Sequence, residues 1–261
     1  MRLPIYYVDA FAEELFQGNP AAVVAVTECL EAATMQSIAS ENNLSETAFV
    51  NVASIPFLIR WFSPIVEVDL CGHATLASAR ILFDDYLPQD SSQISFSAKR
   101  GALSAFKRDD LIYLDFPAEK PTTEKKNKLL ARALGAKPVE LYKGRDDFLA
   151  VFDSEKAIHT IDPDFGLLAK LECRGVIVTA PGDQVDFVSR FFAPRTGVPE
   201  DPVTGSTHTL LVPYWAQKTD KTELAASQLS QRSGRLYCEL NGSRVFIGGH
   251  TKKYLQGEIS I

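Results

Sequence analysis

The sequence is poor in cysteine, the residue that cross-links small domains through disulfides or metal sites. It holds four cysteines in 261 residues, and none of them is in C-x-x-C spacing. This argues against a disulfide framework or a zinc site and favours reduced thiols. No apolar run approaches membrane-spanning length, so we expect no membrane partner. The first residues alternate like a strand and lack the long apolar run and cleavage site of a signal peptide, which predicts a cytoplasmic protein.

Motifs of several common reaction classes are also missing. There is no Walker loop, G-x-G-x-x-G, H-E-x-x-H or G-x-S-x-G, so nothing makes a positive case for a nucleotide, metal or acyl-transfer mechanism. The net charge of −6, with no basic stripe to offset it, weighs against a nucleic-acid partner. With 46% apolar and 23% charged residues, the chain can build an ordinary buried core as one large domain or two smaller ones.

One stretch occurs twice, about half the chain apart. Residues 60–64 (RWFSP) resemble residues 190–194 (RFFAP), and residues 67–75 resemble residues 200–207, with Asp69 aligned to Asp201. Each copy reads as a strand end, a turn and the start of a helix. The elements around the two copies follow in the same order, which indicates an internal duplication.

The hydrophobic pattern predicts the following elements. The first half has strands at 5–10, 21–26, 47–52, 57–62, 94–98, 102–107 and 111–116 and helices at 30–40 and 74–83. The second half has strands at 148–152, 176–180, 185–192, 236–240 and 244–247 and helices at 129–134, 165–171 and 206–216. Pro213 should bend or shorten the last of these helices. We place an N-terminal domain at 1–118 and a C-terminal domain at 125–250, with the final strand, within 252–261, returning to complete the first sheet.

A duplicated chain commonly packs as two similar domains around a ligand cleft. Here the equivalent features are two helix starts with glycine, at Gly72-His73 and at Gly205-Ser206. A helix N-terminus carries free N–H groups and partial positive charge. The pair predicts a site for a small carboxylate, with two well-capped structural helices as the alternative.

Glu46 is the candidate general base. It stands at a strand start among apolar residues, where a raised pKa would suit proton transfer, although a polar turn residue is an equally simple explanation. The corresponding place in the second half holds about Arg174-Gly175, which indicates a site with a single base. His73 could bind a substrate carboxylate, shuttle a proton or serve only the structure.

The remaining candidates are Asp201, Ser206, Cys71 and two further histidines. Asp201 could orient a substrate amine or hydroxyl, share protons with His73, or cap a helix, and Ser206 could cap its own helix or bind substrate. A thiol at a helix start, as at Cys71, can be a nucleophile, but the second motif has no matching cysteine, so we interpret Cys71 as a packing residue. His208 and His250 are expected at the surface.

Four motifs in order resemble the PhzF family of phenazine-biosynthesis-like isomerases over nearly the whole chain. They are residues 18–23 (GNPAAV), 43–49 (NLSETAF), 69–75 (DLCGHAT) and 201–206 (DPVTGS). The resemblance implies an α+β protein of two pseudo-symmetric domains with the diaminopimelate-epimerase-like fold. In that fold each domain is a curved, mostly antiparallel sheet or half-barrel around a central helix, and the active site lies between the domains.

The resemblance also implies a reaction. It assigns Glu46, His73 and Asp201 to catalysis and Ser45, Gly72, Gly205 and Ser206 to substrate binding, with no cofactor and no metal. We expect a cofactor-independent isomerase in a biosynthetic process, acting as a homodimer on a small carboxylate, cyclic and amine-bearing. The alternatives are an amino-acid racemase or epimerase that uses Cys71, and a non-catalytic protein that binds small carboxylates.

Overall fold

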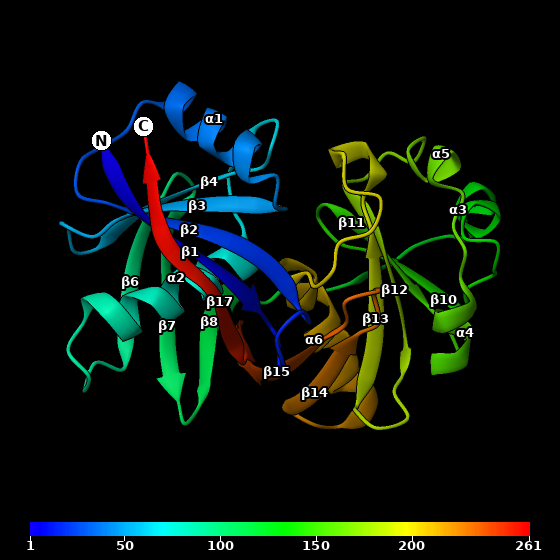
Figure 1. Cartoon of the computed structure of the whole chain (residues 1–261). Coiled ribbons are helices and arrows are strands. Elements are labelled where there is room, and N and C mark those ends of the chain that lie inside the picture. The colour runs from blue at the N-terminus through cyan, green and yellow to red at the C-terminus, as the bar shows by residue number, and fades with distance from the viewer. The chain divides into compact units, whose positions relative to one another are not determined.

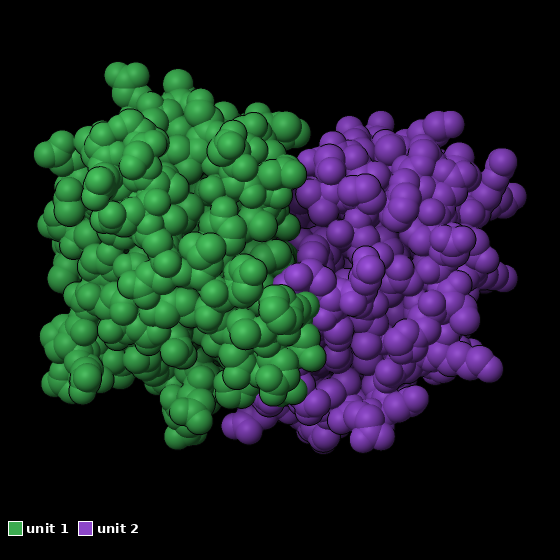
Figure 2. Space-filling view, in the orientation of Figure 1, with its two compact units in different colours: residues 1–115, 248–261 green, residues 116–247 purple.

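The computed structural model describes residues 1–261. The chain forms two compact units, each with its own core. Unit 1 comprises residues 1–115 and 248–261, and unit 2 comprises residues 116–247 (Figure 2). None of the helices is both long and apolar enough to cross a membrane.

Unit 1 is a curved sheet around one helix (Figure 1). Its strands pair in the order β17–β1–β2–β3–β4–β6–β7–β8, in which β2–β3 and β4–β6 are parallel and the others antiparallel. Its elements are β1 (Arg2–Ala10), β2 (Asn19–Val26), α1 (Ala32–Asn42), β3 (Glu46–Asn51), β4 (Phe57–Phe62), β5 (Glu67–Val68), α2 (Gly72–Ile81), the π-helical turn η1 (Leu82–Tyr86), β6 (Gln93–Ala98), β7 (Gly101–Arg108), β8 (Leu111–Pro117) and β17 (Thr251–Ser260).

The central helix α2 is buried along its whole length except at Arg80. Alanines at positions 74, 77 and 79 favour the helix and let strands β1, β2, β3 and β17 approach it closely. Burial on every side explains why this helix shows no polar face. The second helix, α1, covers the sheet from outside, where Met35 and Ile38 join a separate apolar cluster.

Unit 2 repeats this plan. Its strands pair in the order β9–β10–β11–β12–β13–β14–β15, with β11–β12 and β13–β14 parallel. Its elements are β9 (Thr122–Thr123), α3 (Lys128–Ala133), β10 (Glu140–Lys143), β11 (Asp147–Val151), α4 (Glu155–Thr160), α5 (Phe165–Leu168), β12 (Gly175–Pro181), β13 (Phe187–Phe192), the 3-10 turns η2 (Pro194–Thr196) and η3 (Gly205–Thr207), α6 (His208–Thr219), β14 (Glu223–Gln228), β15 (Gly234–Asn241) and β16 (Arg244–Gly249).

The two units share one strand topology. The alternation of parallel and antiparallel pairs from β1 to β7 is the same as that from β10 to β15, and α2 and α6 occupy the same place in it, after β4 and after β13. Two pseudo-symmetric copies of one fold, each a curved sheet with a helix at its centre, therefore make up the chain.

An ion pair recurs at the same position in both units. In unit 1 the Arg60 guanidinium binds both carboxylate oxygens of Glu67, at 2.7 and 2.9 Å, and lies over the Phe62 ring. In unit 2 Arg190 binds Glu200 at the same two distances and lies over Phe192. The repeated sequence motif thus builds the same bidentate, ring-stacked corner twice.

Pro213 does not shorten its helix, which was one of the two effects expected from the sequence. Helix α6 continues to Thr219. Proline cannot donate a bond to the carbonyl of Thr209, four residues earlier. That carbonyl instead accepts a hydrogen bond from the backbone N–H of Glu119, at 2.9 Å, so the lost helical bond is replaced. The sequence pattern also missed five elements of unit 2: β9, β10, α4, η2 and β14.

The last strand, β17, pairs antiparallel with β1. We expect that deleting residues 254–261 destabilises unit 1, because six of the nine paired positions are lost. At about 1 kcal/mol net per hydrogen bond, the loss is about 6 kcal/mol. Urea unfolding of the truncated protein in a Trp215→Phe background, which leaves Trp61 as the fluorophore of unit 1, measures it. Removing only Ile261, beyond the end of β17, is the matched control. Unchanged stability of unit 1 after the longer deletion would contradict the expectation.

Candidate active site

Three chain segments of unit 1 bring their starts together. Strands β2 and β3 are parallel neighbours, with Ala21 opposite Glu46, so the start of β2 lies beside Glu46. Gly18 directs the chain into β2 at a φ of 68°, where any Cβ would lie 2.2 Å from the Ala10 carbonyl oxygen. This turn places Asn19 at the strand start, where it is fully buried. The N-terminal end of α2 supplies His73 to the same place.

The side chains of Glu46 and His73 form the centre of the site. The His73 Nε2 atom lies 3.2 Å from a carboxylate oxygen of Glu46. Its Nδ1 atom lies 3.1 Å from the side-chain amide of Asn19 and 3.6 Å from the Cys71 sulfur. His73 is 5% exposed, whereas the Glu46 side chain is 18% exposed. The Glu46 carboxylate is therefore partly exposed to solvent, whereas the His73 imidazole that contacts it is buried.

Burial and charge set the protonation of this cluster. Burial alone would lower the pKa of His73, but the Glu46 carboxylate 3.2 Å away raises the pKa of this imidazole above its usual value of 6.5. Burial, aided by the negative charge of Glu46, raises the pKa of the Cys71 thiol. The geometry thus favours a proton shared between His73 and Glu46 and a protonated Cys71.

Asp201 of unit 2 is held by neighbours from two elements. Its carboxylate accepts a hydrogen bond from the Thr204 hydroxyl, and its backbone carbonyl accepts one from the amide of Gln228 at 2.8 Å. The Gln228 oxygen in turn accepts the backbone N–H of Thr204 at 2.9 Å. The fully buried Gln228 therefore fixes the loop that leads to Gly205.

Ser206 lies in a charged cluster that the sequence did not reveal. Arg174, the residue before β12, donates a hydrogen bond to the Ser206 hydroxyl at 3.0 Å. The same guanidinium binds both oxygens of Asp147, which is 5% exposed. Burial raises the pKa of Asp147 and Arg174 opposes this shift. The ion pair thus orients a guanidinium N–H onto a predicted substrate-binding hydroxyl.

The other predicted residues occupy the element starts expected of them. Ser45 is half-buried in the bend just before β3, and Gly72 and Gly205 are buried at the first positions of α2 and η3. Glu46, Cys71 and His73 also form a set of donor atoms that could hold a metal ion.

Comparison with known proteins places this arrangement in a family. A profile of the family described as "Phenazine biosynthesis-like protein" matches residues 8–258. The chain is 48% identical to an uncharacterized isomerase of Pseudomonas aeruginosa, over the whole of both chains. The chain belongs to the PhzF family. A crystal structure of a PhzF family protein from Enterococcus faecalis, 46% identical, covers all of both chains with a TM-score of 0.96.

The fold extends beyond the PhzF family. The crystal structure of a probable proline racemase from Agrobacterium radiobacter superposes over 99% of this chain with a TM-score of 0.69, at 8% identity. At that identity the likeness concerns the fold alone, and it is the diaminopimelate-epimerase-like fold that the motifs implied. Three bacterial relatives, 45–49% identical to this chain, carry the name of uncharacterized isomerase without a stated substrate.

One prediction about a single residue is wrong, and three polar residues were missed. His208 is not at the surface: it is fully buried, and its Nδ1 atom donates to the Thr204 carbonyl at 2.9 Å. The His208 side chain, at the first position of α6, faces the core. The spacing of residues along one helix does not show which side faces inward. Arg174, Asp147 and Asn19 were not predicted as site residues. Each is a polar residue at the start of a buried strand, which is the signal that singled out Glu46.

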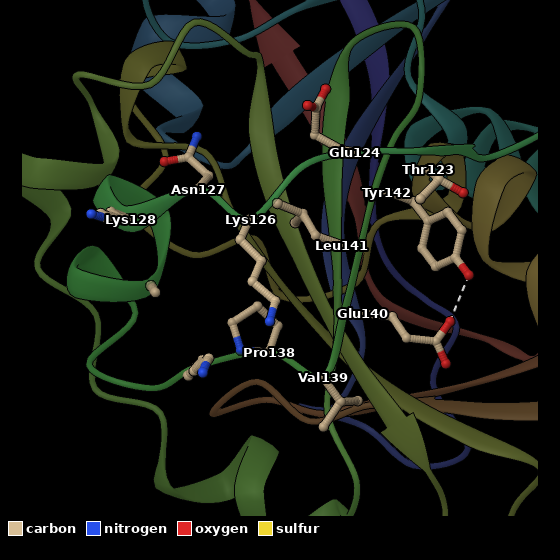
Figure 3. Close-up of a pocket in the computed structure, with 12 residues that line it drawn as sticks. Thr123, Glu124, Lys126, Asn127, Lys128, Pro138, Val139, Glu140, Leu141 and Tyr142 are labelled. Atoms are coloured by element: carbon tan, nitrogen blue, oxygen red, sulfur yellow. Dashed lines mark hydrogen bonds between the residues drawn. The ribbon is translucent and has the colours of Figure 1, made fainter.

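A cavity of about 680 Å³ in unit 2 contains none of these site residues (Figure 3). Lys126, Leu141 and Tyr142 line it, and the Tyr142 hydroxyl points to Glu140. Cavity volume therefore does not lead to the Glu46–His73 cluster, which stands out by its convergence of titratable groups.

The two buried histidines should titrate in opposite directions. Burial lowers the pKa of His208 to about 4, whereas that of His73 lies well above 6.5. Because the folded state favours the His73 imidazolium, the stability this charge contributes is complete below pH 6.5 and is lost as the pH rises through the folded pKa. A pH series of histidine NMR spectra, with His73→Gln and His208→Gln for assignment, checks both directions. A His73 signal that titrates below 6.5 would refute the proton sharing.

Proposed function

We propose that the protein is a cofactor-independent isomerase that moves a proton on a small carboxylate, cyclic and amine-bearing, by general acid–base catalysis. The observation that carries the proposal is the 3.2 Å contact between the Glu46 carboxylate and the buried His73 imidazole. A partly exposed carboxylate held by a desolvated imidazole can take a proton from a substrate and return it.

Glu46 is the group that meets the substrate proton. It abstracts the proton from a carbon beside an unsaturated system and returns it to another carbon of that system. His73 stabilises the charge that develops, since its Nε2 atom faces the Glu46 oxygen. Groups of this kind typically contribute about 10²–10⁴-fold to a rate.

Asn19 can support both protonation states of His73. With its amide nitrogen toward the ring, it donates to an unprotonated Nδ1 at 3.1 Å. After a half-turn of the amide, its oxygen accepts a hydrogen bond from Nδ1–H of the imidazolium. A partner that serves both states lets the imidazole gain or lose a proton without leaving a buried atom unpaired.

The substrate carboxylate is assigned to Ser206, Gly205 and Arg174. Arg174 donates to the Ser206 hydroxyl, and a guanidinium matches carboxylate geometry. Asp201 is assigned to the substrate amine. Ser45 and Gly72, at the starts of β3 and α2, are assigned to further substrate contacts.

Glu46→Gln should abolish proton transfer. The substitution keeps the size of the side chain but removes the base, so we expect at least about a 10²-fold loss of rate. The measurement is exchange of substrate-carbon hydrogen with deuterated water, on a panel of small cyclic and acyclic amino and hydroxy acids. Glu41→Gln, at an exposed position on α1, is the matched control. A Glu46→Gln protein that exchanges as fast as wild type would rule out the proposal.

Replacing Arg174 should weaken substrate binding more than turnover. Loss of one charge-assisted hydrogen bond, about 1.5–3 kcal/mol, corresponds to a rise in KM of roughly 10- to 100-fold with little change in kcat. Because Arg174→Gln alone leaves Asp147 buried without its partner, the Arg174→Gln/Asp147→Asn double variant is the cleaner test. Arg132→Gln, at an exposed position on α3, is the control. An unchanged KM in the double variant would remove Arg174 from the binding site.

Two other functions make different demands on the same residues. A racemase that uses Cys71 needs a thiolate, and burial beside Glu46 raises the pKa of this thiol, which opposes that role. Such a racemase would lose activity when Cys71 is alkylated, and replacing Glu46 would leave its activity unchanged. A binding protein would hold a carboxylate without any exchange.

A further inference from the structure

The Glu46–His73 cluster contains a third donor that the proposed proton transfer does not use. Cys71 precedes α2, is 7% exposed, and has its sulfur 4.0 Å from the His73 Nε2 atom. One donor atom each from Glu46, Cys71 and His73 can be chosen so that all lie within 4.8 Å of one another. Thiolate, imidazole and carboxylate are the three donors that zinc takes in proteins.

The spacing of the donors is close to that of a zinc site. Tetrahedral zinc with ordinary bond lengths sets its sulfur and nitrogen ligands about 3.6 Å apart and its nitrogen and oxygen ligands about 3.4 Å apart. The corresponding separations here are 4.0 Å between the Cys71 sulfur and His73 Nε2 and 3.2 Å between Nε2 and the Glu46 oxygen. The third pair, the Cys71 sulfur and the Glu46 oxygen, lies within 4.8 Å, so the side chains must rotate to bring all three atoms onto one ion.

The surroundings supply the outer support that such a site needs. A histidine that binds metal through Nε2 keeps its proton on Nδ1 and donates it to a fixed acceptor. The Asn19 side-chain amide lies at that position, 3.1 Å from Nδ1, and offers its oxygen after a half-turn. Three protein ligands leave a fourth position open for water or an anion, as in zinc sites that are not purely structural.

We infer that Glu46, Cys71 and His73 bind one zinc ion, and that zinc is an inhibitor of this protein rather than its cofactor. On binding, two protons leave to solvent: one from the Cys71 thiol as the sulfur–zinc bond forms, and one from Nε2 of His73, which frees the Nε2 lone pair for the ion. A Glu46 oxygen completes the set. No electron transfer is involved. The bound ion occupies the oxygen of Glu46 that would take the substrate proton, so zinc and proton transfer exclude each other.

Cobalt reports on the proposed site directly. Titration of the metal-free full-length protein with Co²⁺ should produce a near-ultraviolet thiolate-to-cobalt charge-transfer band that saturates at one equivalent. The band should disappear in Cys71→Ala and persist in Cys29→Ser, which removes an exposed thiol outside the cluster. Glu46→Gln should weaken cobalt binding by about tenfold or more, since it removes a charged ligand. Zinc should displace the cobalt and abolish the band.

Thermal unfolding guards against a misfolded variant. Zinc should raise the Tm of wild type and of Cys29→Ser but not of Cys71→Ala, because a ligand of the folded state stabilises it by mass action. No charge-transfer band in wild type, or a band that survives in Cys71→Ala, would overturn the site.

The inhibitory role rests on the proposed function and has its own test. In the deuterium-exchange assay, zinc should suppress exchange and a chelator should restore it. Exchange that is abolished by the chelator alone would overturn the inhibitory role and make the ion a cofactor. Glu46-independent exchange would instead refute the proposed function and leave the cobalt result standing, so the two failures are distinguishable.

Discussion

The enclosure of α2 by the sheet of unit 1 is the constraint on which the site depends. A helix surrounded by strands needs small, apolar side chains, and the free N–H groups at its N-terminus need partners inside the protein. His73 and Cys71 are therefore out of water because of where the helix begins. A buried imidazole is stabilised when each of its nitrogens has a partner. Asn19 and Glu46, at the starts of two neighbouring parallel strands, meet that need.

The duplication preserved the backbone and let the charges at the strand starts diverge. The Arg60–Glu67 and Arg190–Glu200 pairs, each with its arginine over a phenylalanine ring, show that the two units still share a structural corner. At the start of β3 stands a carboxylate, and just before the equivalent strand β12 stands a guanidinium. Unit 1 thus has the Glu46 carboxylate at this position, and unit 2 has the Arg174 guanidinium, which donates to the Ser206 hydroxyl. Pairing and packing fix the strands, whereas a side chain at the end of a strand can change without disturbing either.

The same desolvation gives the site two chemistries. An imidazole and a carboxylate held together without water can share and pass a proton. With a thiol added, the three groups become a ligand set for a soft or borderline metal. Cys71 directly precedes α2 and was expected only to pack, yet its sulfur lies 3.6 Å from the Nδ1 atom of His73. Whether the Glu46 oxygen meets a proton or a metal decides which chemistry occurs.

The sequence alone determined the duplicated plan, the kind and order of most strands and helices, and the motifs of the PhzF family, because these depend on local periodicity and on residues close together in the chain. Strand Phe57–Phe62 has the bounds that alternation predicts. Tertiary structure decided the rest. His208 is buried, and Arg174 donates a hydrogen bond to the Ser206 hydroxyl. Helix α6 continues past Pro213 because the Glu119 N–H binds the Thr209 carbonyl. These contacts join residues far apart in the chain, or depend on which face of a helix turns inward, and neither is encoded in any single stretch of sequence.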